Sequence, residues 1–319
     1  MSNSKPSDIS QPLVSIITPA YNARNHLPKL IECLQNQSVT NWELVCVDDV
    51  STDGTWEFLQ QASQSDSRIL IHRLKVNSGS AKIPRDTAAQ MSNSLYVCPI
   101  DADDWVEPLY IEKLIQKQKE TQADMVLSQC IGIDDLSGRQ LFLIPDEQFN
   151  FSTTLSAEEA FNMTLRTWQI TASGALIPKQ TWCNSEVFMN TEFTHLNADE
   201  FVSRELLGSV GSIACSTAKY FYRMHSGSVT HDNSRTAEQI YTDYRLYQHA
   251  QKKFDSKTVR RVYSRYIECL FSITKKILRK VYPVSPPVMN YIEKAFSRIN
   301  IQDILRTDLP ISTKIHYTS

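Results

Sequence analysis

The sequence lacks the features that would place a protein in a membrane or outside a cell. No stretch approaches the roughly 18 apolar residues of a membrane-spanning helix, and residues 1–11 are polar, without the apolar core of a signal peptide. The seven cysteines include no C-x-x-C pair, and several stand in apolar runs such as residues 44–47. We therefore expect buried thiols in a reducing cytoplasm, rather than disulfides or a zinc site.

Strong net charge, internal repeats and glycine-rich phosphate motifs are also missing. Lys and Arg (33) nearly balance Asp and Glu (35), which argues against nucleic-acid binding by the chain as a whole. Neither G-x-G-x-x-G nor G-x-x-x-x-G-K-[ST] occurs, so dinucleotide and P-loop chemistry are disfavoured. With 41% hydrophobic residues, the 319-residue chain can bury the core of one large α/β domain with an appendage.

Patterns typical of buried strands alternate with helical patterns over the first two thirds of the chain. The expected strands are residues 13–18, 42–47, 68–74, 97–100, 124–128, 171–178 and 219–225. The expected helices are residues 27–34, 85–91 and 109–119, and others beginning near Thr55, Ser156 and Asp199. Ser156 as N-cap and Glu159 three residues later predict a capping box. Residues 131–156 predict a hairpin or loop. This alternation indicates parallel βαβ units.

Carboxylates gather where two of these strands end. Asp101, Asp103 and Asp104 fall within four residues, where like charges raise one another's pKa unless a cation binds. A divalent metal carrying a phosphorylated ligand would supply that charge. A second acidic group, residues 48–53, follows another strand. Since ligands of open parallel sheets bind beyond the carboxyl ends of the strands, both groups are expected around one crevice.

Four stretches carry a resemblance to a known family. They are residues 19–22 (PAYN), 48–55 (DDVSTDGT), 101–104 (DADD) and 197–200 (NADE). In this order and spacing the chain resembles the family-2 inverting glycosyltransferases with the GT-A fold, of the bacterial kind that builds surface polysaccharide. The resemblance implies an α/β, Rossmann-like, nucleotide-sugar-binding domain with a mainly parallel sheet flanked by helices. We place a polar leader at 1–11, this catalytic domain at 12–235 and a C-terminal helical region at 236–319.

The resemblance implies a donor site at the first two stretches. Its expected residues are Pro19, Tyr21, Asn22, Asp48, Asp49 and Asp53. A carboxylate there can accept charge-assisted hydrogen bonds from a pyrimidine N–H or from ribose hydroxyls. Asp53 would help to shape the loop; the alternative is that Asp53 and Gly54 form an ordinary turn before a helix that starts at Thr55.

The third stretch resembles the D-x-D metal signature of the family. Alternate residues of an extended segment point the same way, so Asp101 and Asp103 can face one crevice on either side of Ala102. Their hard oxygen atoms suit Mn²⁺ or Mg²⁺, which would bridge the two donor phosphates. In the family the second acid is typically the direct ligand, which here is Asp103. Asp104 is either a further ligand or the cap of the following helix.

The fourth stretch implies the general base. An inverting transfer needs a carboxylate that takes a proton from the acceptor hydroxyl, on the face opposite the leaving diphosphate. Many relatives have Glu-Asp here, whereas this chain has Ala198-Asp199-Glu200, so the base is Asp199 or Glu200. The alternative is that both acids only stabilise the first turn of a helix through its dipole.

Three further sets of residues have open roles. Arg85 is the counterpart of an arginine that lies near the diphosphate in relatives, against an ordinary surface role. His225, in a Y-R-x-H segment, is a metal-ligand candidate, against a structural role in a strand. Trp168, Trp182 and His195 either line an acceptor site or belong to the core.

The C-terminal region combines helical apolar spacing with positive charge. Between Lys252 and Val281 the chain has ten Lys or Arg against two acids, a net of 10 − 2 = +8. Such a helix could lie on an anionic membrane, where a lipid-linked acceptor would be found. The alternative places the apolar face on the catalytic domain and the basic face in water.

The function expected is a metal-dependent inverting glycosyltransferase. It would move a sugar from a nucleoside diphosphate, most simply UDP, to a hydroxyl of a glycan or lipid-linked acceptor in surface-polysaccharide synthesis. A cytoplasmic location is expected, with peripheral contact to the inner face of the membrane left open. One alternative is a sugar nucleotidylyltransferase, which would need a Gly- and Lys/Arg-rich phosphate loop; residues 15–24 contain no such loop. The other is a non-catalytic subunit with the transferase fold.

Overall fold

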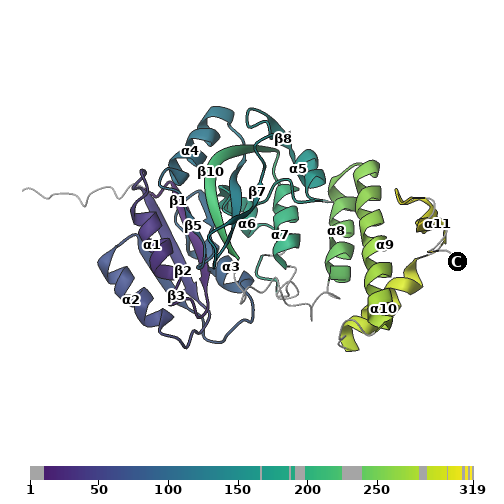
Figure 1. Ribbon diagram of the computed structural model, residues 1–319, viewed down its shortest axis with the longest axis horizontal. Coiled ribbons are helices and arrows are strands. Elements are labelled where there is room, and N and C mark those ends of the chain that lie inside the picture. The colour runs from purple at the N-terminus through teal and green to yellow at the C-terminus, as the bar shows by residue number, and fades with distance from the viewer. Residues whose placement is uncertain are drawn as a thin grey trace, which may run out of the picture.

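The computed structural model describes most of the chain. The described residues are 11–165, 167–186, 188–190, 198–224, 239–279, 286–299, 301–310, 313–314 and 317, with the side chains of 198, 199, 286–288 and 291 left aside. They form a mixed α/β body followed by a group of helices, which lie at the right-hand end of Figure 1. The expected α/β fold class is thereby confirmed.

The first sheet has the order β3-β2-β1-β4-β9, and its first four strands are parallel. Its strands are β1 (Val14–Ala20), β2 (Trp42–Asp48), β3 (Ile69–Arg73), β4 (Tyr96–Pro99) and the antiparallel β9 (Ile177–Pro178). All seven residues of β1 and of β2 are buried. Strands covered on both faces read as continuous apolar runs, which is why their positions could be predicted.

A second sheet has the order β5-β10-β6-β7, with β8 paired to β10. Its strands are β5 (Trp105–Val106), β6 (Met125–Asp134), β7 (Gln140–Ile144), β8 (Thr154–Ser156) and β10 (Ser212–Met224). Leu176 bridges to Val126 of β6 while Ile177 pairs with Val97 of β4, which joins the two sheets. The expected strand over 171–178 is reduced to this short β9, and residues 131–156 contain the β6–β7 hairpin.

Helices cover both faces of the sheet (Figure 1). The first four are α1 (Leu27–Gln35), α2 (Thr55–Ser65), α3 (Lys82–Met91) and α4 (Tyr110–Thr121); α5 (Ala157–Met163), α6 (Lys179–Cys183) and α7 (Ala198–Leu207) follow. Successive β1 residues face opposite sides: Ile16 packs in the cluster with α1, α2 and α4, and Ile17 in the cluster with α3, α5, α6 and α7. The predicted capping box of Ser156 is present.

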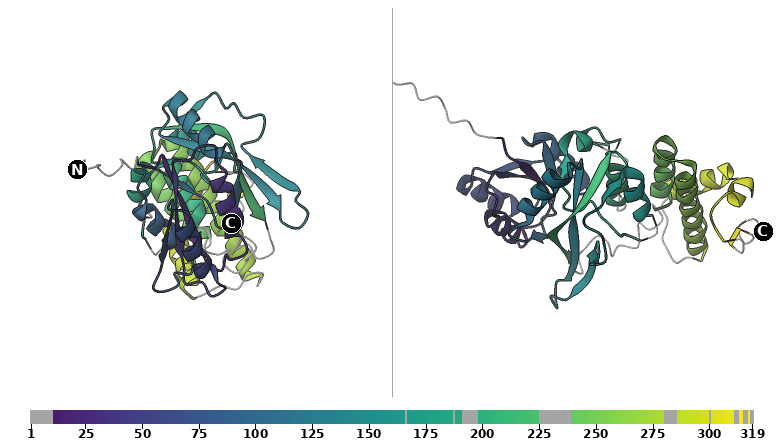
Figure 2. Two further views of the ribbon diagram at one scale, coloured as in Figure 1. Left: turned by 90° about the vertical axis from the view of Figure 1, so that its left-hand side faces the viewer. Right: turned by 90° about the horizontal axis from the view of Figure 1, so that it is seen from above.

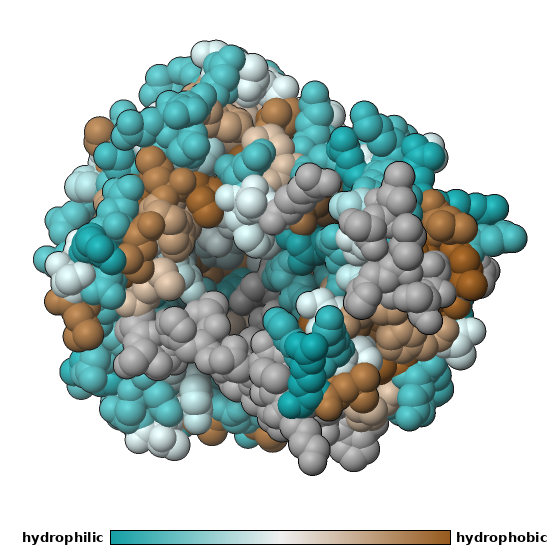
Figure 3. Space-filling model, turned by 45° about the vertical axis from the view of Figure 1, so that its right-hand side comes forward, coloured by the Kyte–Doolittle hydropathy of each residue, from teal (hydrophilic) through white to brown (hydrophobic). Residues whose placement is uncertain are grey.

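The C-terminal helices are α8 (Gln239–Lys253), α9 (Ser256–Leu278), α10 (Pro286–Arg298) and α11 (Ile301–Leu305). Val262 of α9 belongs to the core cluster of the α/β body, whereas Tyr266, Ile267 and Leu270 pack with α8 and α10. The apolar stripe of α9 is thus covered by protein, in part by the α/β body, as the alternative interpretation expected, and otherwise by α8 and α10. Figure 3 accordingly shows hydrophilic side chains over most of this side of the molecule, with hydrophobic ones in scattered groups.

The cysteines and the length of the helices bear on two further expectations from the sequence. All seven cysteines are free, and four of them are buried. Within the described part of the chain, none of the helices has the length and apolar character that crossing a bilayer requires. The right-hand view of Figure 2 shows the C-terminal helices at one end of the α/β body.

Candidate active site

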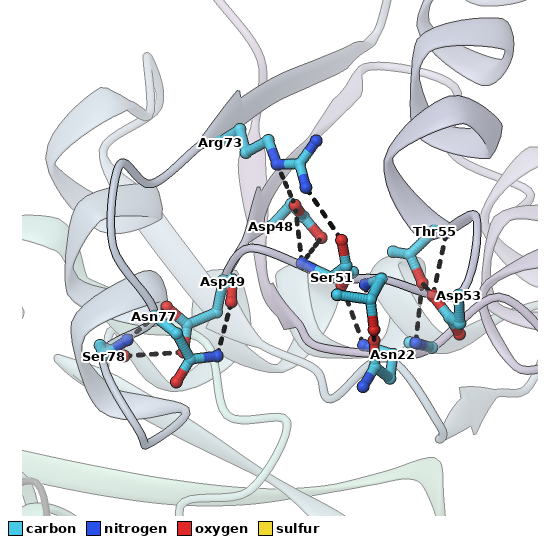
Figure 4. Close-up of polar contacts among 11 residues, drawn as sticks. Asn22, Asp48, Asp49, Ser51, Asp53, Thr55, Arg73, Asn77 and Ser78 are labelled. Carbon is cyan, nitrogen blue, oxygen red and sulfur yellow. Dashed lines mark hydrogen bonds and ion pairs between the residues drawn. The ribbon is translucent and has the colours of Figure 1, made fainter.

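The turn after β1 is fastened to the loop after β2. Asn22 adopts a left-handed backbone conformation (φ 49°), which asparagine tolerates better than most residues. Its N–H donates to Oγ of Ser51 at 2.9 Å, and its Oδ1 accepts from the N–H of Thr52 at 2.9 Å (Figure 4). Pro19, within β1, pairs in register with Val47. The two predicted donor-binding stretches therefore form one surface.

Asp53 stabilises this surface from within. Its Oδ1 accepts hydrogen bonds from the N–H and hydroxyl of Thr55 at 3.0 and 2.5 Å, and its Oδ2 accepts from the N–H of Arg24 at 3.1 Å. Burial alone would raise the pKa of Asp53, but these hydrogen bonds outweigh it and hold the pKa below its ordinary value. Gly54 caps α2 at φ 88°. The turn expected at Asp53 and Gly54 is present, and these contacts suit the loop-shaping role predicted for Asp53.

The two acids that end β2 are held differently. Asp48 is fully buried, forms an ion pair with Nε of Arg73 at 3.1 Å and accepts from the N–H of Ser51. Asp49 is 3% exposed, and its carboxylate accepts from both the N–H and the hydroxyl of Ser78 at 2.8 and 2.9 Å. Figure 4 shows the two carboxylates on opposite sides of the β2 end. Asp48 thus secures the loop, while Asp49 fastens the segment between β3 and α3 to it.

The D-x-D stretch follows β4, beside the end of β1. Nη2 of Arg85, on α3, contacts Oδ1 of Asp101 at 2.6 Å, and the arginine is buried. Asp101 and Asp103 are both partly exposed, whereas Ala102 between them is buried. The structure therefore brings Arg85 to the acidic stretch, as its correspondence to a phosphate-binding arginine requires.

The structure contradicts the capping role predicted for Asp104 and shows other partners for its carboxylate. The helix that follows is α4, capped at Leu109, so Asp104 is not its cap. Asp104 is 1% exposed, and its two oxygens accept from the hydroxyl of Tyr220 and from the N–H of Arg223 on β10. Burial, and next the charges of Asp101 and Asp103, raise its pKa well above the ordinary value. This carboxyl therefore holds the acidic stretch against the second sheet.

Arg223 belongs to the Y-R-x-H segment that contains His225. In the structure its Nε donates to the carbonyl oxygen of Asp103 at 2.7 Å, and its guanidinium forms an ion pair with Asp135 and lies over the ring of Trp105. It therefore holds the backbone on which the predicted metal ligand stands. His225 lies outside the described residues.

The acids predicted as the base belong to the first turn of α7. Asp199 is the second residue of this helix, and its side chain is outside the described part of the structure. Oε1 of Glu200 accepts from Arg204 and from Nη2 of Arg265, the latter at 2.5 Å. Burial would raise the pKa of Glu200, but the two arginines outweigh it and lower the pKa. Glu200 is thus an ionised carboxylate that forms ion pairs with two arginines.

A cavity of about 480 Å³ separates α7 from the D-x-D stretch. Its lining includes Arg85 and Asp101, and also Glu200 and Ser203 of α7. The other lining residues are Pro99, Cys130, Phe142, Ile144, Trp168, Thr171, Ala172, Ser173, Trp182, Val202, Leu206, Tyr220 and Tyr222. The cavity thus brings residues of the predicted leaving-group side together with the helix of the predicted base, and its volume can hold a sugar.

The two tryptophans differ in their surroundings. Trp182 is 4% exposed and donates from Nε1 to Oδ1 of Asp86 at 2.9 Å, so it is a core residue whose edge reaches the cavity. Trp168 also lines the cavity, with Arg204 over its ring at 4.3 Å. His195 lies outside the described residues.

The residues present fit a divalent cation that is shared with a substrate. Among the described residues, no three His, Cys, Asp or Glu side chains converge as a complete metal site. Mg²⁺ is commonly held by only one or two carboxylates together with substrate phosphates. Asp103, with Asp101 beside it, supplies that donor set, and their position next to the buried Arg85 suits a negatively charged ligand.

Comparison with known proteins supplies the family. The model for "Glycosyl transferase family 2" matches residues 15–167. The glycosyltransferase GlyG of Streptococcus pneumoniae is 26% identical over 68% of this chain and 72% of its own length. The poly(ribitol-phosphate) β-N-acetylglucosaminyltransferase TarP of Staphylococcus aureus is 27% identical over 75% of this chain and 81% of its own. The putative teichuronic acid biosynthesis glycosyltransferase TuaG of Bacillus subtilis is 40% identical over a shorter region, 34% of this chain and 43% of TuaG.

Solved structures agree on the fold. The structure of S. aureus TarS in complex with UDP superposes with a TM-score of 0.69 over 96% of this chain and 86% of that chain, at 16% identity. Its complex with UDP-GlcNAc gives the same TM-score over 92% and 83%. The α/β body with C-terminal helices therefore has the GT-A architecture. Residues 15–167 belong to glycosyltransferase family 2, and the protein is a glycosyltransferase.

Proposed function

We propose that the protein is an inverting, metal-dependent glycosyltransferase that uses a nucleoside diphosphate sugar, with UDP as the nucleotide. The observation that carries this proposal is the cavity between Asp101 with Arg85 and the first turn of α7. An in-line displacement needs a leaving diphosphate on one side of the sugar and a base on the other. Asp101 and Arg85, on the proposed leaving-group side, and Glu200, next to the proposed base in sequence, line the same cavity, whose volume of about 480 Å³ can hold a sugar.

The nucleotide is proposed to bind along the joined loops after β1 and β2. Tyr21, 56% exposed, offers an aromatic face to a base. Asp49 follows β2 on the same joined loops and is hydrogen-bonded to Ser78 of the β3–α3 segment. Its carboxylate can accept from a pyrimidine N–H or a ribose hydroxyl. The names of the TarS structures record UDP and UDP-GlcNAc as ligands of that protein, which supports UDP as the nucleotide here.

The diphosphate is proposed to bind beside Asp103, Asp101 and Arg85. A cation held by Asp103 would neutralise charge on the departing phosphates as a Lewis acid. Arg85 adds a guanidinium whose planar donors match phosphate oxygens. Arg223 and Asp104 keep the backbone of the stretch in place through β10, so the carboxylates need not reorganise when the donor binds.

Asp199 is proposed as the general base, in preference to Glu200. A carboxylate that two arginines hold ionised, with a lowered pKa, is a poor proton acceptor. Asp199 precedes it in the same turn of α7, at the end of the helix that lines the cavity. Asp199 would accept the proton of the acceptor hydroxyl as that oxygen bonds to the anomeric carbon, and the bond to the diphosphate breaks on the opposite face.

The acceptor is proposed to be a hydroxyl of a bacterial surface polymer. The names of TarP and TuaG assign those relatives to poly(ribitol-phosphate) and teichuronic acid, which supports this class of acceptor without fixing the linkage.

A panel of nucleotide sugars, incubated with Mn²⁺ and assayed for release of the nucleoside diphosphate, tests the proposal. We expect turnover with at least one UDP-sugar and loss of metal-dependent UDP binding in Asp103→Ala, measured by calorimetry. The matched control is Asp146→Ala, a carboxylate outside the proposed site, which should bind UDP like the wild type. A protein that neither binds nor hydrolyses any nucleotide sugar would refute the proposed function.

A further inference from the structure

Four segments far apart in the chain meet at Glu200. Oε1 of Glu200 accepts from Arg204, one turn later on α7, and from Arg265 of α9. Arg204 also donates to the hydroxyl and carbonyl oxygens of Thr164, and Arg265 donates to the carbonyl oxygen of Leu165 at 2.6 Å. The fourth segment is α8, whose buried Asp243 accepts from Nε of Arg265 at 2.9 Å. We call these side chains the Glu200 cluster: Glu200, Arg204, Arg265 and Asp243.

The donors of Arg265 are divided among three different segments. One contacts the C-terminal helix α8, one the segment after α5, and one the helix α7 that lines the cavity. A guanidinium has its donors in one rigid plane, so three simultaneous contacts fix both position and orientation. Because Asp243 and Glu200 both favour its charged form, they outweigh the burial of the guanidinium and raise the pKa of Arg265.

The cluster also borders the cavity. Glu200 lines it, and Arg204 packs over Trp168, which lines it too. Glu200 follows Asp199 directly in the first turn of α7. The N–H groups in the first turn of a helix have no intrahelical acceptors, so the position of this turn depends on side-chain contacts. The direction in which residue 199 is presented is therefore set largely by what holds Glu200.

We propose that Arg265, contributed by the C-terminal helices, is a positioning residue of the active site. Acting through Glu200, it fixes the first turn of α7, the turn that contains Asp199. This inference rests on the proposed function, in which Asp199 is the base. It gives the C-terminal helical region a part in catalysis, in addition to its packing.

The test compares Arg265→Ala, Arg265→Lys and Glu200→Gln with the wild type, in the full-length protein. We expect kcat to fall about 10- to 100-fold in Arg265→Ala, the scale of a displacement near 1 Å, while KM for the donor changes less than about twofold. Arg265→Lys retains charge but not the three-way geometry, so it should recover only part of kcat. Glu200→Gln should lose kcat but retain measurable turnover.

Arg261→Ala is the matched control. Arg261 lies one turn before Arg265 on α9, and its guanidinium contacts Asn162 of α5 instead of α7. This variant removes the same side chain from the same helix, so wild-type kcat is expected. Should Arg265→Ala fail to fold, Arg265→Lys and Glu200→Gln still decide the question.

A double-mutant cycle separates positioning from general stability. In an Asp199→Asn background, Arg265→Ala should reduce the residual rate by less than about twofold, because residues that act as a unit are not additive. If Arg265→Ala reduces the rate by the same factor in both backgrounds, or if it leaves kcat unchanged, the inference is overturned. If Glu200→Gln abolishes turnover and Asp199→Asn does not, Glu200 is the base and the inference also fails. The proposed function fails separately, when the wild type turns over no donor.

Discussion

Glu205, on the face of α7 away from the Glu200 cluster, gives the protein a measurable pH dependence of stability. It is 2% exposed, and its Oε1 accepts the N–H of Glu186 at 3.1 Å, while Oε2 has no hydrogen-bond partner among the described atoms. Burial raises the pKa of this carboxyl from 4.5 to about 7. Since the folded state holds the proton more tightly than the unfolded state, Glu205 contributes stability below pH 4.5 and loses that contribution as the pH rises through 7.

The size of the effect follows from the two pKa values. Each pKa unit corresponds to about 1.4 kcal/mol, so the contribution lost between pH 5 and pH 8 is about 2–3 kcal/mol. Glu205→Gln keeps the acceptor for Glu186 and removes the ionisation. We therefore expect the free energy of unfolding of the wild type to fall by about 2–3 kcal/mol more than that of the variant over this range.

Urea unfolding at pH 5 and pH 8, followed by circular dichroism, measures this difference. Buried His249, whose pKa is lowered to about 4 by burial, also titrates, but with the opposite sign: it contributes stability above its unfolded value of 6.5 and loses it as the pH falls through about 4. The comparison of two proteins cancels that term because both contain His249. Equal pH dependence in Glu205→Gln and the wild type would refute the reasoning.

The remaining predictions concern the donor loop and the basic helix. Asp49→Asn should weaken UDP binding about 10- to 100-fold in calorimetry, because it weakens two hydrogen bonds from Ser78 to a charged acceptor, each worth about 1.5–3 kcal/mol; unchanged affinity would contradict the placement of the nucleotide. For α9, whose apolar stripe is packed, we expect any sedimentation with anionic vesicles to disappear at roughly 0.5 M salt, where charges are screened within a few ångströms. Salt-resistant binding would instead indicate an inserted apolar surface.

The sequence predicted the part of the fold that is governed by local patterns. Strands β1 and β2 are continuous apolar runs because both faces of the sheet are covered, and the capping box at Ser156 is a local hydrogen-bond pattern. Of the strand expected over 171–178, only β9 is present, because local sequence does not show how this segment packs. Its apolar residues pack in a turn around Gly174, where an added Cβ would lie 2.2 Å from the hydroxyl oxygen of Tyr110.

The candidate site could be predicted only where its residues follow strand ends. Asp49, Asp101 and Asp103 carry a family pattern, but the partners that hold the site come from distant segments. Tyr220 and Arg223 reach Asp104 from more than a hundred residues away, so no spacing in the sequence reveals that contact. The pairing of Glu200 with Arg204 has a visible signal, the i, i+4 spacing of opposite charges.

For Arg265, by contrast, the sequence context wrongly suggests an exposed side chain. In the sequence it counts toward the basic character of the C-terminal region, and its neighbours on the helix suggest a solvated face. In the structure its side chain is only 26% exposed, and it pairs with Glu200 and with Asp243, whose side chain is 2% exposed. Only the packing of α8 and α9 against α7 distinguishes this arginine from the exposed ones.

The most direct test of the central claim is single-turnover transfer by Asp199→Asn with a UDP-sugar that the wild type uses. The account predicts that this variant binds UDP and Mn²⁺ with wild-type affinity while the chemical step slows by at least about 100-fold, the scale of a lost general base. Transfer at the wild-type rate would contradict the assignment of Asp199 and, with it, the mechanism proposed for this site.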